Sequence, residues 1–133
     1  TEIYTLSLHD ALPIYVILPI CGSASQGVIK AAQDAGKYLV FFDSDEYARA
    51  PGSIVGCMAL RQEDLAFSSL QEAFKGSLPF GTARIVGFKE GYIELLDRHP
   101  SYQKNLPAQI RAKMEAAVES IKKGSLVFTV PAL

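Results

Sequence analysis

The sequence predicts an α/β fold in three layers, α/β/α, with a mainly parallel sheet between the helices. Short, uninterrupted apolar runs alternate along the chain with segments whose apolar residues recur at helical spacing. Uninterrupted apolar strands are typical of parallel sheets, which helices cover on both faces. The length of 133 residues, of which 49% are hydrophobic, suits one compact domain or one lobe of a larger protein.

The first strand is expected at residues 15–20, an apolar run that ends before a glycine and serines. Residues 23–27 are expected to form a turn. A helix follows, with apolar residues at helical spacing from residue 28 to 35, and Gly36 ends it. Residues 37–42 are a second apolar run and predict the next strand.

The second half repeats this alternation. A strand is expected at 53–60, and an apolar face with helical spacing predicts a helix over 62–75. The last helix is expected to begin near Pro107 and to end at Lys122-Lys123-Gly124. The remaining expectations are a strand at 82–88 that 92–96 continues, a loop at 99–106 and a short strand at 126–130.

Residues 1–14 are predicted to be an artefact rather than part of the domain. The codons of a common sequencing-library adapter translate into Thr1 to Ile14 without an error. An export signal does not explain this stretch, because no Lys or Arg precedes Lys30 and polar residues interrupt the apolar ones. We therefore expect the domain to occupy residues 15–133 and to lack its natural N-terminus.

Composition argues against several classes of protein. The net charge of -1 gives no basic face for nucleic acid, and no apolar run approaches the ~20 residues of a membrane span. Cys21 and Cys57 lie in apolar contexts, which favours buried free thiols and leaves a disulfide open. His99 has no second histidine or cysteine nearby, so we expect no metal site, no cofactor and no catalytic triad.

Candidate site residues follow three of the expected strands, where open α/β sheets bind their ligands. The first set is the loop 21–27, whose small residues allow close backbone approach, although it is equally typical of an ordinary turn. The second is Asp43-Ser44-Asp45-Glu46, which suits sugar hydroxyls, Mg²⁺ or a solvated acidic loop. The third is Arg61, which is expected to contact the ligand or to pair with Asp43 or Asp45.

Three stretches resemble the C-terminal part of the basic-membrane-protein (Bmp) family, the substrate-binding lipoproteins of ABC importers. They are GVIKAAQDAGKYLVFFDSDE, SIVGCMALRQEDLA and GTARIVGFKEGYIELLD. The first is the most specific, and the resemblance covers most of residues 15–130. The chain departs from the family pattern at Glu46, where the family has Gln, and at Arg61, where it usually has Lys.

The resemblance implies the C-terminal lobe of a type I periplasmic-binding-protein fold, in which two lobes close on a ligand. It implies a nucleoside ligand, with a purine nucleoside favoured, an ABC transporter permease as partner and no enzymatic activity. Asp43 matches the aspartate that holds the ribose hydroxyls. Gly22 and the neighbouring Ser23 lie in the ligand loop, and Arg61 takes the place of the family Lys.

The resemblance also implies a location in the cell envelope, through a lipid anchor that this fragment lacks. Without the N-terminal lobe, the fragment alone is expected to bind ligand weakly or not at all. Two other classes stay open: a Mg²⁺-dependent phosphotransferase or glycosyltransferase that uses Asp43-Ser44-Asp45, and a cytoplasmic ligand-sensing regulator built on the same lobe fold.

Overall fold

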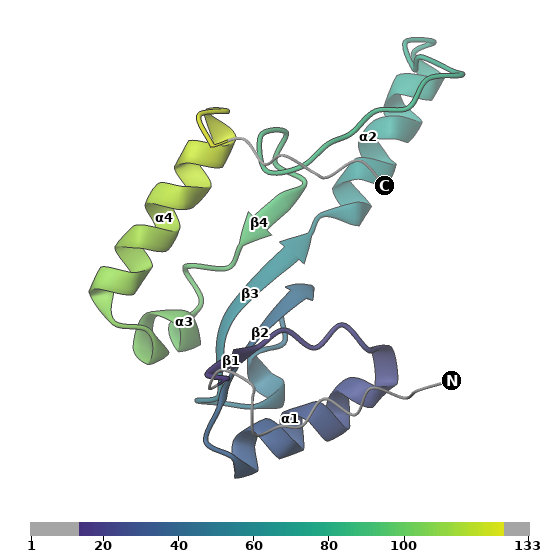
Figure 1. Cartoon of the computed structure of the whole chain (residues 1–133). Coiled ribbons are helices and arrows are strands. Elements are labelled where there is room, and N and C mark those ends of the chain that lie inside the picture. The colour runs from purple at the N-terminus through teal and green to yellow at the C-terminus, as the bar shows by residue number, and fades with distance from the viewer. Residues whose placement is uncertain (1–13, 127–133) are drawn as a thin grey trace, which may run out of the picture.

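The computed structural model describes residues 14–126 and contains a sheet in the order β1-β2-β3-β4. The first three strands are parallel, and β4 runs antiparallel to β3. Figure 1 shows α1 and α4 on opposite sides of this sheet, so the expected α/β fold is confirmed. The strands are β1 (Val16–Ile17), β2 (Tyr38–Asp43), β3 (Ile54–Leu60) and β4 (Ile93–Leu95).

Three of the helices lie where the apolar periodicity predicts them, within a few residues. The first begins earlier than expected, at Ser25, inside the predicted turn. The last begins directly after Pro107, and Gly124 follows its end with φ +69°. The helices are α1 (Ser25–Asp34), α2 (Gln62–Phe74), α3 (Pro100–Asn105) and α4 (Ala108–Lys122), with short 3-10 turns η1 (Gly22–Ala24) and η2 (Tyr47–Arg49).

Two predictions of secondary structure are wrong. Residues 82–88 do not form a strand, because β4 takes the position beside β3 and residues 82–88 pair with no strand of the described chain. Residues 99–106 are not a loop throughout, because Pro100 starts α3 with its fixed φ and His99 caps it. The strand expected at 126–130 lies, apart from Leu126, outside the described residues, as do residues 1–13 of the expected artefact.

The core lies between β2, β3 and the helices that pack on them. Leu39 and Phe41 of β2 are buried with Ile29 and Ala32 of α1, because alternate residues of a strand face the same way. Cys57 of β3 is buried as expected. The prediction that Cys21 is buried is wrong, because it lies in the loop after β1 rather than in a strand, and both cysteines are free thiols. The other members of this core are Tyr47, Ala50, Ile54, Leu95 and Tyr102.

Helix α2 extends away from the sheet (Figure 1) and has no buried residue. Its apolar residues Phe67, Leu70 and Phe74 are all exposed. The chain leaves the sheet at Arg61 and returns at Tyr92, and the Arg61 N–H donates to the Tyr92 carbonyl at 2.9 Å. None of the helices within residues 14–126 is long and apolar enough to cross a membrane.

Candidate functional site

Asp43 ends β2 in a conformation that is unusual for its residue type. Its φ is +92°, and it is the one residue other than glycine with positive φ in the described part of the chain. Such a backbone is strained in L-residues, and strain of this kind gathers at functional sites. The side chain is exposed, and no hydrogen bond or ion pair within residues 14–126 engages its carboxylate. Asp43 therefore presents an unpartnered acceptor at the carboxyl end of the sheet.

Gly22, another candidate site residue, lies in the loop that faces the end of β2. Gly22 and Asp43 both line a pocket of about 210 Å³ between the loop after β1 and the end of β2. The φ of Gly22 is +56°, a conformation that favours glycine and brings bare backbone to the surface. Ser23 is the middle residue of the adjacent turn η1 and does not line the pocket.

Arg61 lies on the other side of Asp43. The two residues line a second, wider pocket of about 490 Å³ that also includes Asp45 and the start of α2. The Arg61 side chain pairs with Glu94 of β4, with 2.8 Å between Nε and Oε2, and these hydrogen bonds raise the pKa of Arg61. Of the two alternatives for Arg61, the ion pair with Asp43 or Asp45 is wrong, because β4 brings Glu94 to the Arg61 side chain; the contact with a ligand stays a prediction.

Asp45 lines the wider pocket with a half-exposed side chain and also contacts the protein. Its Oδ1 accepts the Tyr47 N–H at 3.1 Å, and its Oδ2 lies 3.8 Å from Nε2 of His99. Ser44 donates to Glu46 at 2.8 Å, and Glu46 also pairs with Arg49 at 2.9 Å. The neighbours of Asp43 are thus held by contacts within the protein. Within residues 14–126, no cluster of three or more His, Cys, Asp or Glu could hold a metal ion.

Tyr47 and His99 support this loop, and the sequence analysis missed both. Their rings stack with centroids 4.3 Å apart, and the Tyr47 hydroxyl accepts the buried Cys57 N–H at 3.1 Å. Burial raises the pKa of Tyr47, and it raises the pKa of Cys57 to about 11. His99 Nδ1 accepts the Ser101 N–H at 3.1 Å and so caps α3. The pair His-Pro was the available signal, because proline favours the first helical position.

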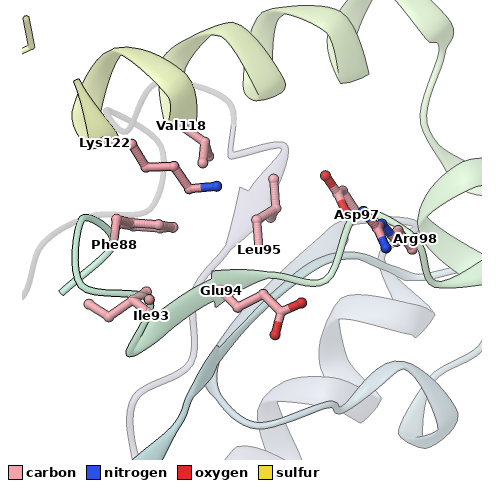
Figure 2. Close-up of a pocket in the computed structure, with 9 residues that line it drawn as sticks. Phe88, Ile93, Glu94, Leu95, Asp97, Arg98, Val118 and Lys122 are labelled. Carbon is pink, nitrogen blue, oxygen red and sulfur yellow. The ribbon is translucent and has the colours of Figure 1, made fainter.

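A third pocket, of about 350 Å³, lies between β4 and α4 and holds none of the predicted site residues. Figure 2 shows Leu95 and Glu94 on opposite sides of the strand, with Leu95 toward α4. The Glu94 carboxylate points away from Lys122 and pairs with Arg61, on the side of the Asp43 pockets. This pocket therefore borders the candidate site without contributing to it.

Solved structures share the fold, and the following two are among them. One is a transcriptional activator of the comK gene from Bacillus halodurans, with TM-score 0.71 and 16% identity over 86% of this chain and 39% of that one. The other is an ABC transporter system solute-binding protein from Aeropyrum pernix K1, with TM-score 0.61 and 16% identity over 90% of this chain and 41% of that one. The chain thus spans about two-fifths of the length of these structures.

The family comparison is more specific than these structural likenesses. The model of the Bmp family, described as ABC transporter substrate-binding protein PnrA-like, matches residues 6–125. This match includes all four strands, both pockets beside Asp43 and the stretches that carry the sequence resemblance. The chain therefore belongs to the Bmp family of PnrA-like ABC transporter substrate-binding proteins.

Proposed function

We propose that this chain carries one half of the ligand site of an ABC importer's substrate-binding protein, and that the ligand is a nucleoside. The observation that carries the proposal is the unpartnered carboxylate of Asp43, held in strained backbone between two pockets. Membership of the Bmp family supports the transport role and gives no support to an enzymatic one.

The chemistry of Asp43 suits the two hydroxyls of a ribose. A carboxylate has two acceptor oxygens, and a hydrogen bond to a charged group contributes about 1.5–3 kcal/mol. Its neighbours Asp45 and Glu46 already hold contacts within the protein, so Asp43 is the member of the acidic loop that is available to a ligand. Gly22 would bring backbone groups to the same ligand, and Ser23 and Arg61 would bound the site.

The rest of the function belongs to a longer protein. Because the chain spans about two-fifths of the similar solved structures, we propose that a second lobe completes the site. A permease would receive the ligand, and a lipid anchor would hold the protein on the outer side of the membrane. A purine nucleoside remains the favoured ligand, and the 133-residue chain alone should bind it weakly.

Calorimetric titration of the longer protein with guanosine and inosine tests the proposal. Asp43→Asn should weaken binding by about 100-fold or more, since two charge-assisted hydrogen bonds are lost or reduced. A 2′,3′-dideoxynucleoside should bind the unchanged protein with a similar loss. Asp34→Asn is the matched control, because Asp34 is an exposed carboxylate of α1 that pairs with Lys30 away from the pockets. Unchanged affinity in Asp43→Asn would overturn the assignment.

A ligand-sensing regulator is the second candidate, because one structure with this fold is a transcriptional activator. A DNA-binding domain in the longer reading frame, in place of a lipoprotein signal, would favour it. The metal-dependent enzyme is less well supported, because both oxygens of Asp45 face protein groups. Binding of Mg²⁺ that Asp43→Asn and Asp45→Asn each abolish would revive the enzyme candidate.

A further inference from the structure

Glu94 of β4 holds Arg61, a cationic side chain that lines the wider pocket beside Asp43. Four carboxylates line that pocket of about 490 Å³, and among the described residues Arg61 is its only positive group. Nε and Nη2 of Arg61 both donate to Oε2 of Glu94, with 2.8 Å between Nε and Oε2. The guanidinium charge is therefore neutralised at the edge of the pocket. The four carboxylates are those of Asp43, Asp45, Glu63 and Asp64.

The pairing of β3 with β4 fixes the position of this ion pair. Arg61 follows the last residue of β3, and Glu94 is the register partner of Ala59 in that strand. The backbone N–H of Arg61 donates to the Tyr92 carbonyl at 2.9 Å. Because alternate side chains of a strand point to opposite faces, the buried Leu95 faces α4 and Glu94 points to the other side (Figure 2), where it meets Arg61. The ladder therefore brings the two charged groups together.

The hydrogen bonds to Glu94 occupy an edge of the Arg61 guanidinium that could otherwise bind a phosphate. Arginine recognises carboxylates and phosphates alike, through two N–H donors of its planar fork. In this chain Glu94 accepts from the Nε and Nη2 donors. The four carboxylates of the pocket are exposed, and like charges placed together in a binding site weaken binding. The pocket therefore suits an uncharged ligand and repels an anionic one.

We propose that Glu94 is a specificity-determining residue, which makes the wider pocket reject anionic ligands such as a nucleoside monophosphate by occupying the Arg61 guanidinium. This inference rests on the proposed nucleoside site and adds the residue that separates a nucleoside from its phosphorylated form. Discrimination between ligands commonly depends on a repulsive element as well as on contacts to the preferred one. Glu94 acts through Arg61, so it is a positioning residue that does not need to touch the ligand.

Inorganic phosphate tests the proposal in the 133-residue chain without any nucleoside. The NMR resonance of the Arg61 Nε–H group, identified by its absence from Arg61→Lys, is followed while phosphate is added at constant ionic strength. In Glu94→Gln the apparent affinity for phosphate at Arg61 should be at least about tenfold higher than in the unchanged chain. Equal affinities in the two proteins would overturn the proposal.

Glu72→Gln is the matched control for this titration. Glu72 pairs with Arg84 at 3.3 Å, outside the pocket, and the side chain of Arg84 is 44% exposed, as is that of Arg61. In Glu72→Gln the Arg61 resonance should respond to phosphate as it does in the unchanged chain. Because Glu94 is itself half exposed, its replacement by glutamine should leave the chain folded, which the dispersion of the NMR spectrum checks.

Calorimetric titration of the longer protein with guanosine and guanosine 5′-monophosphate gives the second measurement. The unchanged protein should prefer guanosine, and Glu94→Gln should lower the ratio of the two affinities by about tenfold. The double variant Arg61→Gln, Glu94→Gln should lose this gain, because no guanidinium remains to bind the phosphate. A gain that persists without Arg61, or a preference of the unchanged protein for the monophosphate, would overturn the proposal. Absence of guanosine binding would refute the proposed function, while the titration with inorganic phosphate would still decide the role of Glu94.

Discussion

The strained backbone of Asp43 leads to a prediction in which the usual order of two substitutions is reversed. At most positions a protein with alanine is more stable than the same protein with glycine by about 0.5–1 kcal/mol, because glycine loses more conformational freedom on folding. At φ +92° the Cβ of an L-residue meets the backbone, which costs about 1–2 kcal/mol and is absent in glycine. Asp43→Gly should therefore be more stable than Asp43→Ala by about 0.5–1 kcal/mol.

Urea unfolding of the two variants, followed by far-ultraviolet circular dichroism, measures this difference. With a slope of about 1.5 kcal/mol per molar urea, the midpoint of Asp43→Gly should lie roughly 0.5 M above that of Asp43→Ala. Both variants remove the same carboxylate, which has no partner within residues 14–126, so side-chain contacts cancel in the comparison.

Lys30 of α1 provides the control, since it is exposed and lies in regular helix. There Lys30→Ala should be more stable than Lys30→Gly by about 1 kcal/mol. The double difference between the two sites is then about 1.5–2 kcal/mol. If Asp43→Ala equals or exceeds Asp43→Gly in stability, the backbone at Asp43 is not strained and the argument for a specialised site loses its basis.

Four further predictions concern the groups that support the site. Tyr47→Phe should destabilise the chain by about 1–3 kcal/mol in urea unfolding, because the buried Cys57 N–H loses its acceptor; a change below 0.5 kcal/mol would contradict that hydrogen bond. At pH 8 the native chain should react with one equivalent of a disulfide reagent, at Cys21, since burial raises the pKa of Cys57 to about 11. The pKa of Cys57 in the folded chain exceeds the ordinary value of 9.0, so the unfolded chain loses this proton first as the pH rises. The free energy of unfolding should therefore fall between about pH 9 and pH 11, and a constant free energy of unfolding over this range would refute the prediction. His99→Ala should lower the free energy of unfolding by about 1 kcal/mol more than His99→Asn, because asparagine can still cap α3. Equal melting temperatures of the two variants would exclude the capping role.

Local patterns in the sequence predicted most of the fold. Uninterrupted apolar runs located β2 and β3, and helical spacing located α1, α2 and α4 within a few residues. The wrong predictions depend on pairing across long sequence separation. Residues 82–88 have strand-like composition, but β4 occupies the position beside β3 and leaves them without a neighbour.

The candidate site, like the fold, was predicted only in part from local patterns in the sequence. Asp43 and Gly22 were each predicted to follow a parallel strand, where open sheets bind their ligands, and in the structure both line one pocket. The ion pair of Arg61 with Glu94 and the stack of Tyr47 on His99 join residues far apart in the chain. No local pattern carries that information, so the partners of these residues required the three-dimensional structure.

The hydrogen bond between Arg61 and Tyr92 brings together the two ends of the thirty-residue segment from Gln62 to Gly91. Its two ends leave β3 and enter β4 side by side, so a tight turn between them would convert these strands into a simple hairpin. A hydrogen bond of 2.8 Å between Ser68 and the Tyr92 hydroxyl holds this segment where it meets the sheet. The far end of the segment extends away from the sheet (Figure 1). Insertions or deletions beyond the first turn of α2, which lines the wider pocket, can therefore accumulate without disturbing the strand ends that present Asp43.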